Sequence, residues 1–200
     1  MPRIAILASG RGSNFSAIAQ AVNEKRLQAE IVLVASDRAE ALVLEKARGQ
    51  GLQTLVEKNH IKLAKVLKEL QVDFVVLAGY MRILKQEFIS EFQDARGFSR
   101  IVNIHPSLLP ELPGLESYRR AFEQKLAQTG VTVHFVDAGV DTGPICAQKS
   151  FSITDCLSVE DVEKRGLMIE HELYPATLSW ILADRFDILK QGEILYVRPH

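Results

Sequence analysis

Short apolar runs alternate with amphipathic segments along the first half of this 200-residue chain. The apolar runs are rich in Ile, Val and Leu, have the length of buried strands, and occupy residues 3–8, 31–35, 52–56, 73–78 and 100–104. Between them apolar positions recur at helical spacing, which predicts helices over 14–25, 40–50, 61–70 and 83–92. This alternation predicts right-handed crossovers on a buried, mostly parallel sheet.

The pattern changes after residue 105. Proline and glycine interrupt residues 106–114, which indicates a loop, and a short helix is expected near 116–126. Residues 131–136 alternate with period two, and residues 144–151 could pair with them. The second half of the chain therefore adds a mixed part to the parallel sheet.

One long helix and a hairpin complete the chain. The helix is expected over about 158–185, and its start resembles a capping box with Ser158 as the N-cap. Residues 187–197, turning at Gln191 and Gly192, have the pattern of a closing hairpin. We find no repeat or linker, and we predict one Rossmann-like α/β domain, a mostly parallel sheet flanked by helices.

Composition narrows the possible partners. The 24 basic and 25 acidic residues give a formal charge of −1 without long blocks, so no broad surface for nucleic acid or an anionic membrane is expected. No stretch approaches the roughly 20 apolar residues that cross a bilayer. Cys146 and Cys156 form no C-x-x-C pair, which suits a reducing compartment. We therefore expect a soluble, cytoplasmic protein that acts on small molecules.

A glycine-rich turn follows the first strand. Residues 9–14 read S-G-R-G-S-N, and such a turn at a helix N-terminus offers free N–H groups and a positive dipole end to an oxyanion. A phosphate is the natural ligand, because the dinucleotide motif needs a third glycine where this chain has Phe15. Asp37 stands near the position of a ribose-binding acid. A purely structural turn is the alternative.

A second group of polar residues suggests acyl or formyl transfer. Asn103 and His105 are two positions apart in a strand and so share a face, and Asp141 opens the sequence D-T-G-P. Asn103 could donate a hydrogen bond to an oxyanion, and protonated His105 could donate another and act as a general acid. If Asp141 lies close, its charge would raise the pKa of His105.

Other interpretations of these residues remain open at this point. The asparagine could satisfy a loop backbone, the histidine could be an ordinary half-buried one, and the aspartate could simply begin a turn. A metal site could also be formed by His105, His134, Asp137 and Asp141, although no histidine pair at i, i+4 and no cysteine partner supports it.

Together these segments resemble the phosphoribosylglycinamide formyltransferase family, whose members use folate. Residues 103–115 are similar to the family's N-I-H-P-S-L-L-P-x-x-P-G-L segment. The likeness continues, in the same order along most of the chain, through residues 10–14, 76–84, 132–136, 139–144 and 170–171. The resemblance implies the formyltransferase fold over 1–200, with a ribotide-binding half (1–100) and a catalytic and folate-binding half (101–200).

The resemblance also implies an activity and a set of site residues. The activity is transfer of the formyl group of 10-formyltetrahydrofolate to the amine of N1-(5-phosphoribosyl)glycinamide in purine synthesis, without a metal, by a monomer or weak homodimer. The implied catalytic residues are Asn103, His105 and Asp141. The implied ribotide-binding residues are Gly12, Ser13, Asn14, Pro106 and Glu170. The implied folate-binding residues are Met81, Arg82, Ile83, Leu84, Asn103, Asp137, Ala138, Gly139, Val140 and Asp141.

Some positions depart from the family pattern or have ordinary explanations. The segment near 56–67 lacks the family's arginine, and Lys58, His60 or Lys62 could substitute. Glu116 and Leu167 also depart. Taken alone, residues 81–84 favour the start of a helix, and Glu170 an exposed helix face. A deformylase or another formyl-folate transferase, and a nucleotide-sensing module without catalysis, are the competing functions.

Overall fold

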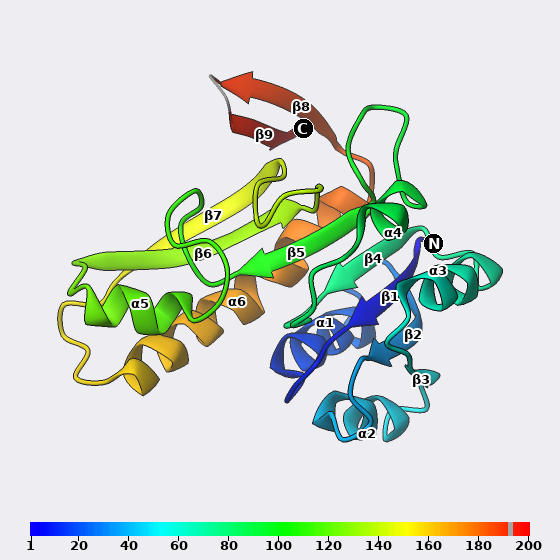
Figure 1. The fold of residues 1–200 in the computed structure, drawn as a ribbon, viewed down its shortest axis with the longest axis horizontal. Coiled ribbons are helices and arrows are strands. Elements are labelled where there is room, and N and C mark those ends of the chain that lie inside the picture. The colour runs from blue at the N-terminus through cyan, green and yellow to red at the C-terminus, as the bar shows by residue number, and fades with distance from the viewer. Residues whose placement is uncertain (192–193) are drawn as a thin grey trace.

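The computed structural model describes residues 1–191 and 194–200, and one nine-stranded sheet runs through it in the order β3-β2-β1-β4-β5-β6-β7-β9-β8 (Figure 1). The first five strands of this order are mutually parallel, as the alternating pattern predicts. Their bounds are β1 (Arg3–Leu7), β2 (Glu30–Ser36), β3 (Thr54–Val56), β4 (Phe74–Leu77) and β5 (Ile101–His105).

The second half of the sheet is mixed. β6 (Gln128–Phe135) runs antiparallel to β5, and β7 (Ile145–Ser152) runs antiparallel to β6. β8 (Phe186–Gln191) and β9 (Ile194–Pro199) form the predicted antiparallel hairpin, and β9 joins the sheet parallel to β7. The predicted fold class is therefore confirmed; Gly192, expected in the hairpin turn, lies outside the described residues.

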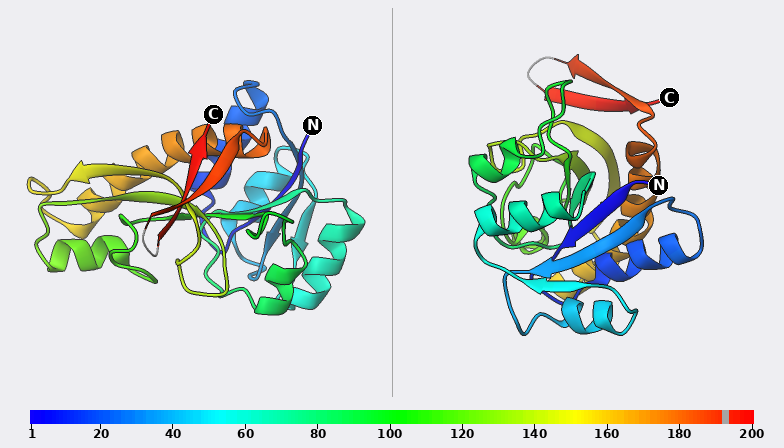
Figure 2. Two further views of the ribbon diagram at one scale, coloured as in Figure 1. Left: turned by 90° about the horizontal axis from the view of Figure 1, so that it is seen from above. Right: turned by 90° about the vertical axis from the view of Figure 1, so that its right-hand side faces the viewer.

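Helices cover both faces of the sheet (Figure 2). In β1, Ile4 and Ile6 face one core while Ala5 and Leu7 face the other, because side chains alternate along a strand. On the first face lie α1 (Ser13–Asn23), α2 (Leu42–Arg48) and α6 (Val159–Leu182). On the second face lie α3 (His60–Glu69) and α4 (Gln86–Ser90). A further short helix, α5 (Ser117–Glu123), packs beside the first half of α6 (Figure 1).

The predicted helix over 83–92 is wrong at both ends. Residues 81–85 are irregular and α4 covers only Gln86–Ser90. The chain leaves β4 through Gly79 with φ of +77°, and the N–H of Met81 is donated to the side-chain oxygen of Ser9 at 2.9 Å. A backbone donor held by a neighbouring strand end is not available to start a helix, so residues 81–84 stay extended across the sheet edge.

Tyr174 of α6 joins this helix to the strand ends where the site lies. The side chain is fully buried, and its hydroxyl lies 2.9 Å from the carbonyl oxygen of Leu77 and 3.0 Å from that of Val102. These carbonyls belong to the last residue of β4 and to the residue before Asn103 in β5. The contact therefore fixes the separation of the two strands next to the candidate catalytic residues.

Candidate active site

The predicted site residues gather at the carboxyl ends of the parallel strands. The glycine-rich turn follows β1, residues 81–84 follow β4, and Asn103 and His105 end β5. Carboxyl ends of parallel strands meet at one edge of a sheet, where open α/β folds bind their ligands. The sheet therefore brings three predicted groups of residues to one edge.

The pairing of β5 with β6 sets the faces of the central residues. Asn103 is opposite His134 and His105 is opposite Thr132. The amide nitrogen of Asn103 lies 3.2 Å from Nε2 of His134, whose Nδ1 donates to the carbonyl oxygen of Phe135 at 2.8 Å. That carbonyl can only accept, so neutral His134 carries its proton on Nδ1 and accepts from Asn103 through Nε2. His134 thus holds the Asn103 amide group in place.

Asp141 reaches these side chains from the loop between β6 and β7. Its Oδ2 lies 3.3 Å from Nδ1 of His105, and its Oδ1 lies 3.5 Å from Nε2 of His134. The N–H of Gly114 also donates to Asp141 Oδ2, at 2.8 Å. Asp141 has φ of 56°, an uncommon value for a residue other than glycine, and these three contacts hold it there. The structure therefore brings the three residues predicted to be catalytic together.

The other ring nitrogen of His105 faces the loop before α5. Nε2 lies 3.0 Å from the carbonyl oxygen of Leu112 and 3.2 Å from the hydroxyl oxygen of Ser117. The Ser117 hydroxyl itself lies within donating distance of the same Leu112 oxygen, at 3.0 Å. Because a carbonyl oxygen only accepts, Nε2 carries a proton, and this nitrogen is the donor that a ligand oxygen would meet.

The pKa of His105 does not shift as the sequence suggested. Burial is the largest influence and lowers the pKa of this ring below its ordinary value. The charge of Asp141 and the hydrogen bond to Leu112 act in the expected, raising direction, but they do not overcome burial. The prediction of a raised pKa is therefore wrong in its net direction, because the side chain is only 4% exposed.

Asp141 remains a carboxylate in these surroundings. Burial, the largest single influence, acts to raise its pKa. The neighbouring His134 ring, the charge of His105 and the Gly114 N–H act in the opposite direction, and together they hold the pKa of Asp141 below its usual range. The pair therefore combines an anionic Asp141 with a histidine that releases its proton readily.

The glycine-rich turn has the backbone shape that an anion site needs. Gly12 is the N-cap of α1 with φ of 71°, and no side chain caps the helix. The first N–H groups of an α-helix have no partner within the helix, so those of Ser13 and Asn14 are free to meet a ligand. A Cβ atom on Gly12 would lie 2.7 Å from Cγ2 of Val43, so α2 approaches the turn too closely for any other residue.

Glu170 is not the exposed helix residue that its position suggested. It is 6% exposed, and its two carboxylate oxygens accept from the Asn14 amide at 2.6 Å and from the Tyr118 hydroxyl at 2.8 Å. Ser13 and Asn14 begin α1, so Glu170 on α6 is placed directly beside the turn. Pro106 lies half-buried directly after His105. The predicted ribotide residues thus lie on both sides of β5.

The predicted folate residues form two exposed segments at the same edge. Met81 and Ile83 are 53% and 74% exposed, whereas Leu84 packs into the core with α3 and α4. In the loop before β7, Asp137 accepts from the Gly139 N–H at 3.0 Å and from the Thr142 hydroxyl at 2.7 Å. Residues 138–140 are exposed as a result. Apolar surface and free backbone groups are thus presented on two sides of the Asn103 position.

A cavity of about 380 Å³ lies beyond residues 81–84. Its lining includes Lys58, His60, Arg82 and Lys85, and the Arg82 guanidinium donates to the backbone oxygen of Lys58. His60 is 6% exposed, and burial, with the charges of Arg82 and Lys85, lowers its pKa, so it is not the cation here. Lys62 lies in the first turn of α3. Of the three residues expected to replace the missing arginine, Lys58 is the one placed as a cation beside Arg82.

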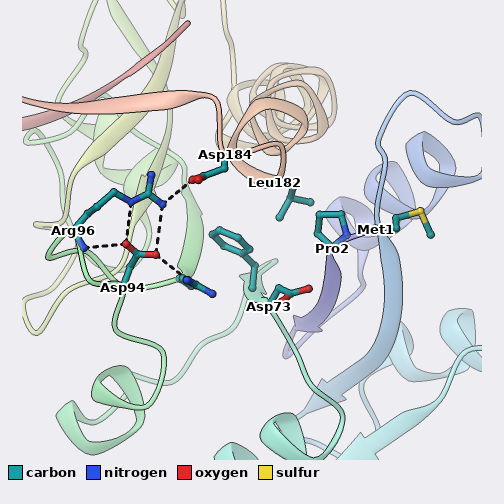
Figure 3. A pocket seen from close by; sticks show the side chains of 9 residues that line it. Met1, Pro2, Asp73, Asp94, Arg96, Leu182 and Asp184 are labelled. Atoms are coloured by element: carbon teal, nitrogen blue, oxygen red, sulfur yellow. Dashed lines mark hydrogen bonds and ion pairs between the residues drawn. The ribbon is translucent and has the colours of Figure 1, made fainter.

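A cavity of about 410 Å³ lies at the opposite edge of the sheet (Figure 3). Its lining includes Pro2, Asp73 and Phe74, which precede or begin β1 and β4, so it opens at the amino ends of the strands. The charges are paired with one another, since Asp94 binds Arg96 at 2.9 Å and Arg100 at 3.0 Å, and Arg96 binds Asp184 at 2.7 Å. This cavity is therefore separate from the candidate site.

Two further searches concern metals and membranes. Among the residues described, no three or more His, Cys, Asp or Glu side chains are grouped so that they could hold a metal ion. Within the same residues, no helix is long and apolar enough to cross a membrane.

Sequence reasoning underrated or missed three residues that the fold places in the site. His134 was considered only as a metal ligand, although its alternation with Thr132 in a strand predicted to pair locally was a usable signal. Ser117 and Tyr118 lie in the helix after the proline-rich loop, and nothing in their local pattern indicates contacts with His105 and Glu170.

Comparison with known proteins gives a consistent result. Residues 2–178 match the family described as formyl transferase. A phosphoribosylglycinamide formyltransferase from Bacillus subtilis is 35% identical over 191 residues, which make up 91% of this chain and 95% of that protein. The trifunctional purine biosynthetic protein adenosine-3 of Drosophila pseudoobscura is 39% identical over 188 residues, and this chain spans 13% of its length. The crystal structure of glycinamide ribonucleotide transformylase 1 from Symbiobacterium toebii has a TM-score of 0.90 and 39% identity, covering 100% of this chain and 94% of that one.

Proposed function

This chain belongs to the formyl transferase family, and we propose that it transfers the formyl group of 10-formyltetrahydrofolate to the amine of N1-(5-phosphoribosyl)glycinamide. A folate-derived formyl donor follows from the family. The observation that carries the proposal is the contact of His105 Nδ1 with Asp141 Oδ2 at 3.3 Å, beside Asn103 at the carboxyl end of β5. It supports acyl transfer because the site pairs two oxyanion donors with an acid.

The reaction has a simple balance of bonds and protons. The amine nitrogen attacks the formyl carbon, and a tetrahedral centre with a negatively charged oxygen forms. The Asn103 amide and the Nε2–H of His105 donate to that oxygen, and the latter exchanges the Leu112 carbonyl for it. The bond from carbon to N10 of the folate then breaks. One proton leaves the attacking nitrogen and one arrives at N10, so tetrahydrofolate and the formylated ribotide are the products.

The two predicted histidine partners have different tasks in this scheme. Asp141 opposes the effect of burial on His105, so the imidazolium becomes accessible when the oxyanion develops next to Nε2. His134 accepts from the Asn103 amide and so orients the second oxyanion donor. No step requires a metal or a redox partner.

The substrates are assigned to sites by their charges. The ribotide phosphate is placed at the N–H groups of Gly12, Ser13 and Asn14 and its amine near Glu170. The folate ring is placed between residues 81–84 and 137–141. We infer that Lys58, Arg82 and Lys85 receive the carboxylates at the far end of the folate, since these cations line a cavity beside residues 81–84.

A two-substrate assay tests the function. We expect tetrahydrofolate to appear only when both 10-formyltetrahydrofolate and the ribotide are present. His105→Ala should lower kcat by about 10²- to 10⁴-fold, the usual contribution of general acid catalysis, and should leave the Kd of the ribotide within twofold. His200→Ala, in an exposed histidine of the C-terminus, is the matched control and should be fully active.

Two results would contradict the proposal. Consumption of the formyl folate in the absence of the ribotide would indicate hydrolysis in place of transfer. Normal turnover by His105→Ala would remove this residue from the reaction.

A further inference from the structure

Glu170 is a buried carboxylate held by two neutral donors. Asn14 Nδ2 donates to one oxygen and the Tyr118 hydroxyl to the other, and the residue is 6% exposed. In the described part of the chain no cationic side chain pairs with this carboxylate. A buried anion without a cation is costly unless it is fully hydrogen-bonded or meets a charge from outside the chain.

Asn14 contributes a second unsatisfied acceptor at the same place. A carboxylate can only accept, so the Asn14 amide must direct Nδ2 toward Glu170, which fixes the direction of its Oδ1. This Oδ1 is buried and accepts no hydrogen bond from the residues that the structure describes. A buried acceptor without a donor is rare in a folded protein and indicates a ligand that donates. Oδ1 and the Glu170 carboxylate are therefore two acceptors separated by one amide group.

Tyr118 reaches Glu170 only because residue 166 is glycine. A Cβ atom on Gly166 would lie 2.1 Å from the Tyr118 hydroxyl oxygen and 2.2 Å from Cζ of its ring. Gly166 faces the core of α6 one turn before Glu170, so the phenol of α5 crosses α6 at this glycine. The ring is 7% exposed, and burial, with the charge of Glu170, raises the pKa of Tyr118 far above its usual range. The phenol therefore stays protonated and donates at any physiological pH.

We propose that Tyr118 and Gly166 are positioning residues that orient Glu170, and that Glu170 and Asn14 Oδ1 together recognise the primary amine of the acceptor substrate. This deepens the proposed function and rests on it. An amine has two hydrogens to donate, and two fixed acceptors leave its lone pair as the free direction for attack. As the nitrogen attacks it gains positive charge, which the Glu170 carboxylate stabilises more strongly than it does the neutral amine.

The arrangement also makes amine recognition separable from phosphate recognition. The phosphate is assigned to backbone N–H groups of the turn, whereas the amine is assigned to side chains held by Tyr118. A change confined to the Tyr118 hydroxyl should therefore weaken only ligands that carry the amine. A residue with a merely structural role would weaken ligands with and without the amine alike.

Calorimetric titration of two ligands tests this. The probes are N1-(5-phosphoribosyl)glycinamide and N1-(5-phosphoribosyl)acetamide, in which hydrogen replaces the amine. We expect the wild type to bind the glycinamide more tightly. Tyr118→Phe should weaken the glycinamide by at least about tenfold, the range for a lost hydrogen bond to a charged group, and leave the acetamide within twofold. In turnover, the KM of the ribotide should rise while that of the folate stays unchanged.

A second variant reaches the same contact from α6, and a control removes a hydroxyl elsewhere. Gly166→Ala forces the phenol off Glu170 and should produce the same selective loss. Tyr196→Phe, in a half-buried tyrosine of β9, should change neither affinity. Far-ultraviolet circular dichroism and thermal unfolding compare the folding of all three variants.

The outcomes separate the inference from the function. Equal weakening of both ligands by Tyr118→Phe, or no weakening of either, overturns the positioning role. Equal affinity of the wild type for the two ligands overturns recognition of the amine. A wild type that binds the ribotide but forms no tetrahydrofolate would refute the proposed function and leave the binding result standing.

Discussion

Gly12→Ala should be one of the more destabilising single substitutions in this chain, and the structure separates two causes. Gly12 has φ of +71°, and the left-handed region costs a residue with a Cβ about 1–2 kcal/mol. The new methyl would also lie 2.7 Å from Cγ2 and 2.8 Å from Cβ of buried Val43, and 3.0 Å from its Cα. Overpacking of this kind costs about 1–3 kcal/mol. The expected loss is therefore about 2–5 kcal/mol.

Gly51→Ala is a matched control for the first cause. Gly51 follows α2 with φ of +73°, and a Cβ there would meet nothing within 4 Å. Its expected cost is only the backbone term, about 1–2 kcal/mol. The difference between the two variants measures the contact between the turn and α2. Adding Val43→Ala to Gly12→Ala should recover part of that difference, because the side-chain atoms leave while the backbone atom at 3.0 Å remains.

Urea unfolding of the four proteins, followed by circular dichroism, measures these costs. Phosphate binding gives an independent readout, since the ribotide should bind to Gly51→Ala with unchanged affinity and to Gly12→Ala much more weakly. Equal losses of stability for the two glycine variants would refute the close approach of Val43. Unchanged ribotide affinity in Gly12→Ala would refute the assignment of the turn to the phosphate.

Two further predictions concern titrating groups. Asp141→Asn removes the charge that raises the pKa of His105, so the decline of kcat with rising pH should begin at lower pH; an unchanged pH–rate profile would show that the pair is not coupled. Hydrogen bonds from Arg96, the largest cause, lower the pKa of Asp94 from 3.8 to about 2, so this carboxylate should stabilise the fold above about pH 4 and lose that effect as the pH falls toward 2. Asp94→Asn should therefore cost on the order of 1–2 kcal/mol at pH 7, allowing for the partly exposed arginines, and little at pH 2; urea unfolding at both pH values checks this, and an equal loss at both would contradict it.

Local patterns predicted most of the elements because each pattern arises from the backbone within a few residues. The capping box at Ser158 is an example: its hydroxyl accepts from the Asp161 N–H at 3.2 Å, and Asp161 accepts in return from the Ser158 N–H at 3.1 Å. Where a distant strand captured a backbone donor, as Ser9 did with Met81, the helical pattern of residues 83–92 misled. The ends of α4 could not be read locally because the competing partner lies in β1's following turn.

The candidate site divides in the same way. Strand periodicity placed Asn103 and His105 on one face, and the glycine spacing placed a turn with free N–H groups after β1. The contact of Asp141 with His105, by contrast, depends on a loop more than thirty residues away. The sign of the His105 pKa shift depends on how much of the ring is buried, which only the packed loop before α5 sets.

By itself, the sequence determined the order of strands and helices, the fold class and the residue types available for chemistry, because these follow from short-range periodicity and side-chain chemistry. The tertiary structure alone decided that Tyr118 passes Gly166 to hold Glu170, that His134 holds Asn103, and that burial outweighs Asp141 at His105. Each of these depends on distances between segments remote in the chain. Interactions between charges and hydrogen-bonding groups change steeply with distance and burial, and no local pattern carries that information.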